Sequence, residues 1–149
     1  MPAIQTTYGT SIAPAYEGMI ANSEPQTILS KQVETAGGIG FGKVCVQGTA
    51  DDQIRVSETV RAFRGITVAS HIAGNLVVSD AYVKGETVPV MEEGVIWVMA
   101  SVAVAVGDPV YYVPATGVLT NVATSNTQIA NAMWDSSTTG AGLAKLRLR

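Results

Sequence analysis

The chain has 149 residues, of which 47% are apolar and only 14% are charged, and its formal net charge is −3. About 25% of the residues in an ordinary soluble domain are charged, so this chain has few ionic groups to keep its surface dispersed in water. The weak net charge excludes an acid-rich disordered chain and the basic footprint of a nucleic-acid-binding protein. We expect one domain with a full apolar core, whose surface is largely covered by copies of itself or by a partner. The alternative is a monomeric β-domain with an apolar surface.

Residues 1–36 differ in composition from the rest of the chain. Prolines at positions 2, 14 and 25 interrupt any long helix or central strand there. We expect an extended N-terminal arm over 1–36 that docks on another surface, with a disordered leader as the alternative, and a β-domain over 37–149. Removing residues 1–30 is expected to leave this domain folded. The apolar residues that would make the docking contacts are Ile4, Tyr8, Ile12, Tyr16 and Met19.

The first half of the β-domain alternates short strand signals with glycine-rich turns. Strands are expected over 43–47 and 63–70, where β-branched and aromatic residues are enriched. The polar stretch 51–61 fits either a poor strand or a loop. Residues 75–82 fit a short strand, a turn or a single helical turn.

The densest strand signals lie between residues 85 and 121. The segment 95–100 is apolar at every position, which predicts a strand covered on both faces. Glu93-Gly94 predicts a turn between this strand and a short strand over 87–91. Further strands are expected over 110–113 and 118–120, on either side of a Pro/Gly-containing turn.

The C-terminal third predicts a strand over 128–134, a Ser/Thr/Gly loop over 135–142, and a last strand over 143–149. In the last strand Leu146 and Leu148 fall on one face, whereas the other face carries Lys145, Arg147 and Arg149. This basic face is either solvated or meets an acidic partner, which makes Arg147 and Arg149 candidate interface residues.

Together these signals predict an all-β fold, a compact β-barrel or sandwich of short antiparallel strands with an extended N-terminal arm. The apolar stretch 95–106 is too short to span a membrane as a helix and is broken by Ser101. The N-terminus lacks the pattern of a signal peptide. With a single cysteine, Cys45, the chain forms no intrachain disulfide, which fits assembly inside a reducing cell.

We find no motif that carries chemistry. Residues 37–43 nearly spell a phosphate loop, but Val44 stands where the motif needs Ser or Thr, and a strand follows where a helix is required. His71 is the only histidine and has no ligand cluster near it in sequence. Cys45 is expected to be a buried, inert thiol. We therefore expect no enzyme activity, catalytic residue, cofactor, metal or small-molecule substrate.

The two tryptophans are expected to differ in environment. Trp97 lies among Val, Ile and Met and is assigned to the core. Trp134 ends a strand beside Asp135 and is an interface candidate. An exposed Trp134 would also allow an alternative function, a glycan-binding β-sandwich module.

One block of the chain points to a known family. Residues 107–112 (GDPVYY) and 114–121 (PATGVLTN) resemble the corresponding block of tailed-bacteriophage capsid cement, or head-decoration, proteins. The layout is also similar, with a Pro/Gly-broken arm at the start and a short Leu/Arg strand at the end. The resemblance covers most of the chain, although the motifs that carry it are turn sequences and not catalytic signatures. Tail, tube and head-completion proteins have similar strand and turn patterns and remain the alternative.

The resemblance implies a non-enzymatic virion protein that is assembled in the host cytoplasm. Such a protein binds the outer surface of the expanded capsid and clamps neighbouring subunits of the major capsid protein against the pressure of packaged DNA. It commonly does so as a homotrimer at local threefold positions. Its partners would be the major capsid protein and copies of itself, with no contact to nucleic acid or membrane.

Overall fold

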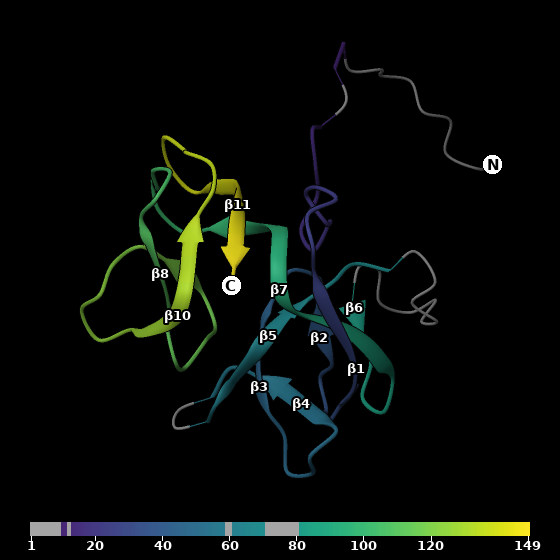
Figure 1. The fold of residues 1–149 in the computed structure, drawn as a ribbon. Coiled ribbons are helices and arrows are strands. Elements are labelled where there is room, and N and C mark those ends of the chain that lie inside the picture. The colour runs from purple at the N-terminus through teal and green to yellow at the C-terminus, as the bar shows by residue number, and fades with distance from the viewer. Residues whose placement is uncertain (1–9, 12, 59–60, 71–80) are drawn as a thin grey trace, which may run out of the picture.

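The computed structural model describes residues 10–11, 13–58, 61–70 and 81–149. Within these residues the chain forms strands and no helix, which confirms the expected all-β class (Figure 1). No helix long and apolar enough to cross a membrane occurs in the described ranges. The strands are β1 (Thr27–Val33), β2 (Ile39–Gly40), β3 (Val44–Gln47), β4 (Gln53–Val56), β5 (Phe63–Thr67), β6 (Ala81–Tyr82), β7 (Thr87–Ala100), β8 (Pro109–Tyr112), β9 (Leu119–Thr120), β10 (Thr127–Trp134) and β11 (Gly142–Leu148).

Nine of these strands form one sheet that closes on itself twice through β7. Along the sheet the order is β1-β4-β3-β5-β7-β11-β10-β8-β9, and β7 pairs in addition with β1 and with β9. The strands β1, β4, β3, β5 and β7 therefore form one closed circuit, the first ring. The strands β7, β11, β10, β8 and β9 form another, the second ring.

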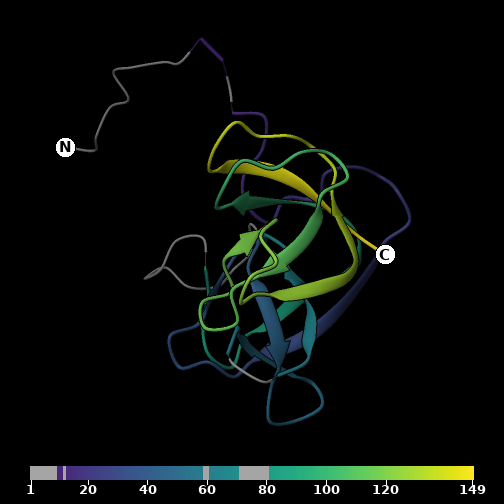
Figure 2. The same ribbon diagram turned by 90° about the vertical axis from the view of Figure 1, so that its left-hand side faces the viewer.

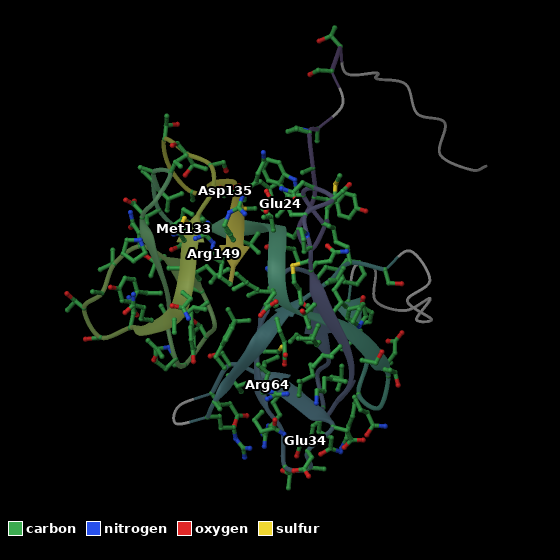
Figure 3. All side chains as sticks on the ribbon, in the orientation of Figure 1. Glu24, Glu34, Arg64, Met133, Asp135 and Arg149 are labelled. Carbon is green, nitrogen blue, oxygen red and sulfur yellow. The ribbon has the colours of Figure 1, made fainter. Side chains whose placement is uncertain are left out.

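The two rings occupy different parts of the molecule. In Figure 1 the strands β8, β10 and β11 lie at the left, and β1, β3, β4 and β5 lie lower and further right. Figure 2 views the molecule from the side of the second ring. The labelled side chains of Figure 3 place Glu34 and Arg64 on the first ring and Asp135 and Arg149 on the second.

Strand β7 passes from one ring to the other at Gly94. Glu93 pairs with Thr27 of β1, whereas Gly94 pairs with Leu148 of β11. Gly94 has a φ of 127°, a conformation that side-chain-bearing residues rarely adopt, and a Cβ here would lie 2.9 Å from Cβ of Gln26. The expectation of a turn at Glu93-Gly94 is therefore wrong. The glycine allows one long strand to change neighbours without reversing direction.

Strand β1 lies inside residues 1–36, which the sequence assigns to an arm. Six residues of β1 pair with β7 in antiparallel register, and two pair with β4 in parallel. Residues 27–33 are thus part of the sheet, and only the residues before Thr27 can form an arm. The local pattern is weak because most positions of β1 remain partly exposed.

The remaining strands follow the sequence signals closely. The stretch 51–61, expected to be either a poor strand or a loop, contains the strand β4. Residues 75–80 and His71 lie outside the described residues. Strands β3, β5, β8, β9, β10 and β11 begin and end within three residues of the expected positions. Two pairings, β1–β4 and β7–β9, are parallel in an otherwise antiparallel sheet.

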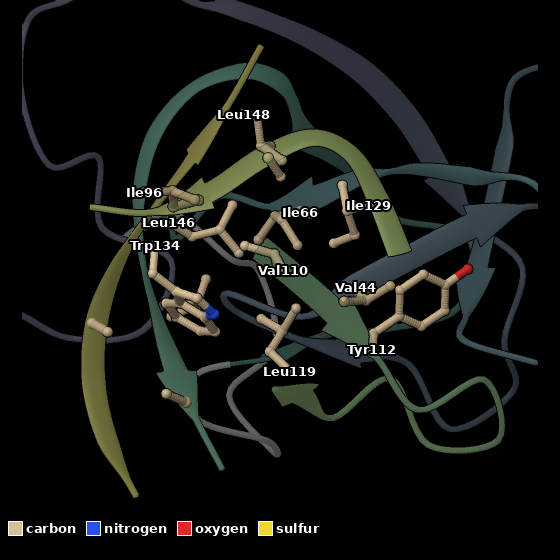
Figure 4. Packing of buried hydrophobic residues seen from close by; sticks show 14 of the residues in the cluster. Val44, Ile66, Ile96, Val110, Tyr112, Leu119, Ile129, Trp134, Leu146 and Leu148 are labelled. Carbon is tan, nitrogen blue, oxygen red and sulfur yellow. The ribbon is translucent and has the colours of Figure 1, made fainter. Parts of the chain in front are cut away.

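The apolar interior consists of two clusters. The larger one fills the second ring, where Trp134 is 0% exposed, and extends to Val44 and Ile66 of the first ring. Figure 4 shows its side chains pointing towards one another. The smaller cluster fills the first ring and consists of Val33, Ile39, Phe41, Cys45, Ile54, Tyr82, Val88 and Val90. Strand β7 contributes side chains to both clusters, so it links the interiors of the two rings.

Candidate interaction surfaces

The chain segment before β1 docks on the chain's own second ring. It runs along β7 and forms an isolated bridge between Ile20 and Ile96. Ala15 is buried in this docked position. The backbone hydrogen bonds are Gly18 N to Trp97 O at 2.8 Å, Trp97 N to Met19 O at 2.9 Å, Ala21 N to Val95 O at 2.9 Å, and Ala69 N to Gly18 O at 2.8 Å.

Because this segment is docked, the N-terminal candidate residues differ in how far they are open to a partner. Met19 is half-buried against the body, whereas Tyr16 is 44% exposed. Ile4, Tyr8 and Ile12 lie outside the described residues. A truncation of residues 1–30 would remove the docked segment and about half of β1. A truncation that tests the arm must therefore be shorter.

A three-residue ion-pair network ties the N-terminal segment to the last strand. Arg147 Nη2 donates to Glu24 Oε1 at 3.0 Å and lies 3.2 Å from Asp135 Oδ2, and Arg147 Nη1 also donates to Glu24. The hydrogen bond from Arg147 holds the pKa of the Glu24 carboxyl below its ordinary value. The hydrogen bonds to Glu24 and Asp135 raise the pKa of the Arg147 guanidinium. Arg147 is therefore occupied by contacts within its own chain.

The alternation expected for the last strand is present in β11. Ala144, Leu146 and Leu148 are buried, and the residues between them are more exposed. Lys145 lies over the ring of Trp97, with its Nζ 5.5 Å from the ring centroid. Arg149 is exposed and remains the member of the basic face that is most open to a partner.

The two tryptophans have the reverse of their expected environments. Trp134 is fully buried in the second ring, so it presents no surface to a partner or to a sugar. Its Nε1 is buried without a hydrogen-bond partner. Trp97 is half-buried, because it points outward from β7 while Ile96 and Val98 point into the ring. The assignment of Trp134 as an interface residue is wrong, and the glycan-binding alternative loses the residue on which it rested.

The described surface includes the following two shallow clefts. One has a volume of about 220 Å³ and is bordered by the ion pair of Lys43 with Glu17, which are 2.7 Å apart. Its other walls include Met99, Ser101 and Val118. The second cleft, of about 190 Å³, lies where the rings meet and is lined by Phe63, Arg64, Glu92, Ile129, Ala130, Leu148 and Arg149. Both combine apolar walls with an ion pair, Glu17 with Lys43 in the first cleft and Arg64 with Glu92 in the second.

The titratable groups form no reactive constellation in the described ranges. No three residues among His, Cys, Asp and Glu lie close enough there to hold a metal ion. Cys45 is buried as expected, and burial raises the pKa of its thiol to about 12. The thiolate that a nucleophile requires is therefore scarce at neutral pH.

The fold is similar to that of a phage capsid chain. A chain of the structure described as "The capsid of Myoviridae Phage XM1" superposes with a TM-score of 0.80 at 15% identity, covering 100% of this chain and 98% of that one. A chain of the head fibre gp8.5 N base of bacteriophage phi29 reaches a TM-score of 0.45 at 15% identity, with coverages of 84% and 95%. None of the curated protein sequences compared with the chain matches it. The first likeness shows that the two chains share one all-β fold.

The family follows from the sequence itself. The family model for the structural cement protein (E217 gp24/Pam3 gp6) matches residues 4–149, nearly the whole chain. The chain therefore belongs to this family of phage structural cement proteins, which confirms the resemblance stated above.

Proposed function

We propose that the chain binds the outer surface of the expanded phage head, where it holds neighbouring subunits of the major capsid protein together. The observation that supports this proposal is the match of the cement family over residues 4–149. The chain then acts in the virion as a small homo-oligomer, a trimer at local threefold positions. It has no catalytic function in this role.

The size of the chain explains why both an oligomer and an arm are needed. A durable protein contact buries roughly 1,000 Å² or more, which is much of one face of a domain this small. Joining several copies turns weak single contacts into a strong combined one through effective concentration. An extended segment adds contact area without a larger core, and the entropy lost on ordering it weakens binding to wrongly spaced subunits.

The capsid contacts are assigned to the residues before the docked segment and to the exposed end of β11. On the N-terminal side these are Ile4, Tyr8 and Ile12, together with Tyr16, which is exposed within the docked segment. On the C-terminal side it is Arg149, which borders the cleft between the rings. Met19 and Arg147 act indirectly, because their contacts with the body hold these two regions in place.

Co-sedimentation with empty capsid shells tests the proposal. Purified protein is mixed with expanded and with unexpanded shells, and the pelleted protein is quantified. We expect saturable binding to the expanded shells and little binding to the unexpanded ones. Absence of binding to both would contradict the proposed function.

A truncation of residues 2–14 tests the arm. It spares the hydrogen bonds of Gly18 and Ala21 and all of β1, so the domain is expected to stay folded. We expect binding to expanded shells to weaken by at least about tenfold, which corresponds to 1.4 kcal/mol. A full-length variant with Ile4, Tyr8 and Ile12 replaced by serine separates loss of apolar contacts from loss of length. Shell binding unchanged in both variants would remove the arm from the mechanism.

A further inference from the structure

The middle of the second ring is nearly free of charge. Residues 95–134 contain one charged residue, Asp108. Its carboxylate accepts hydrogen bonds from Asn121 Nδ2 at 2.7 Å and from Ala105 N at 3.0 Å, and these bonds lower its pKa. The one charge of this stretch is thus engaged by its own loops.

Exposed apolar side chains gather on the same stretch. The described surface carries eight exposed large apolar side chains, and five of them lie on residues 99–106 and 118–122. Val106 is the most exposed of the eight, at 64%. The five are Met99, Val102, Val106, Val118 and Val122, which we call the valine face.

The two segments of the valine face lie side by side. Ala100 pairs with Leu119 in parallel register, and Ser101 N donates to Leu119 O at 3.0 Å. Asn121 Nδ2 donates to Ala103 O at 3.3 Å as well as to Asp108. The five side chains therefore lie on two adjoining segments of the second ring, and Met99 and Val118 line the same cleft.

The backbone beneath the valine face is held in place before any partner binds. Val104 forms a bridge with Thr138, and the Thr138 N donates to Val104 O at 2.9 Å. Val106 N donates to Ser137 Oγ at 3.2 Å, and Gly107 N donates to Trp134 O at 2.8 Å. Because these loops are already ordered, binding to this face loses little conformational entropy.

We infer that the valine face is the surface through which copies of this chain bind one another. This inference rests on the proposed function, since it names the self-contact of the cement oligomer. Interfaces between identical subunits are more apolar than other protein interfaces, and their centres are depleted of charge. In a closed cyclic oligomer a patch beside the rotation axis meets its own copies, and an uncharged patch does so without like-charge repulsion.

The surroundings of the face fit this assignment. Met99 and Val118 line the 220 Å³ cleft, whose rim carries the ion pair of Glu17 with Lys43. An apolar centre with a polar rim is the usual arrangement of a protein interface. A charged partner would find no opposite charge on residues 95–134, because the single carboxylate there is already bonded.

The test is the mass of the protein in solution, measured by sedimentation velocity over a range of concentrations. We expect the wild type to be an oligomer, and Val106→Asp to raise the concentration of half-dissociation by at least about tenfold. Val122→Asp is expected to act in the same direction. The matched control is Val83→Asp, at an exposed valine near the first ring, which should leave the oligomer intact. Circular dichroism verifies that each variant is folded, as expected for substitutions at exposed positions.

The outcomes separate this inference from the proposed function. A monomeric wild type, or an oligomer that survives both Val106→Asp and Val122→Asp, overturns the inference. Loss of shell binding with the oligomer unchanged also overturns it, because the face would then contact the capsid. Dissociation by Val106→Asp supports the inference even if neither wild type nor variant binds shells, a result that would contradict only the proposed function.

Discussion

The two rings share β7 and the same kind of closed strand circuit, but their surfaces differ in chemistry. Residues 27–93, which build most of the first ring, contain 14 charged residues, whereas residues 94–149 contain five. On the first ring Arg55 pairs with Glu34 and Glu58, and Arg64 pairs with Glu92. The second ring instead exposes the valine face. Charged side chains are thus concentrated on the first ring, and exposed apolar side chains on the second.

The interiors of the rings differ less than their surfaces. The second ring encloses the larger cluster, with Trp134 fully buried. The smaller cluster of the first ring includes Tyr82 and Phe41, whose ring centroids lie 5.0 Å apart in an edge-to-face arrangement. Because β7 belongs to both, neither ring can lose its packing without affecting the other.

The largest effect is expected from truncating a core side chain in either ring. Trp134→Ala should lower the free energy of unfolding by about 3–5 kcal/mol, and Ile54→Ala by about 2–5 kcal/mol. Both variants should unfold in a single transition by calorimetry, because the shared strand couples the rings. Trp97→Ala, at a half-buried position, is the control and should cost less. Two separate transitions, with one shifted in each variant, would show that the rings are independent.

The second effect concerns the point where β7 changes rings. Gly94→Ala should cost about 1–3 kcal/mol, because alanine at a φ of 127° is strained and its Cβ would contact Gln26. Chemical denaturation measures the change. Gly140→Ala is the matched control, since a Cβ there meets nothing within 4 Å. Equal stability of the two variants would contradict the assigned function of Gly94.

The smallest effect is expected at the link between the N-terminal segment and the second ring. Arg147→Gln removes the ion pairs to Glu24 and Asp135, and amide exchange at Gly18 and Ala21 should become faster while the core is unchanged. Lys145→Gln, which leaves the network intact, is the control. Exchange rates equal to those of the wild type would show that the network does not hold the segment.

The ion pair of Glu24 with Arg147 also predicts that docking of the N-terminal segment depends on pH. The folded pKa of Glu24 is depressed, so its stabilising contribution is present above the ordinary glutamate pKa of 4.5 and is lost as the pH falls through the lower, folded value. The wild type should therefore approach the exchange rates of Arg147→Gln in acid, whereas the variant should lack this pH step. A step of equal size in both proteins would assign it to another carboxyl group.

Much of the fold follows from local patterns. The alternation of Leu146 and Leu148 with charged residues predicts β11 because side chains of a strand point to opposite faces in turn. The low charge of the chain predicts a surface covered by protein, and we propose that this surface is the exposed apolar one over 99–106 and 118–122. The run 95–134 with a single charged residue is the signal from which this face could have been predicted.

Other features depend on partners that are distant in sequence. Strand β1 has a weak pattern of its own and is defined by pairing with β7, about 60 residues away. The environments of Trp97 and Trp134 are set by which side of a closed ring each residue faces, and two apolar strands look alike until the ring closes. Alternation and turn residues therefore determined the class and most strands, and the resemblance of residues 107–121 indicated the family that the family model matches. The tertiary structure alone decided which residues are inside, because burial depends on the neighbours that non-local pairing brings together.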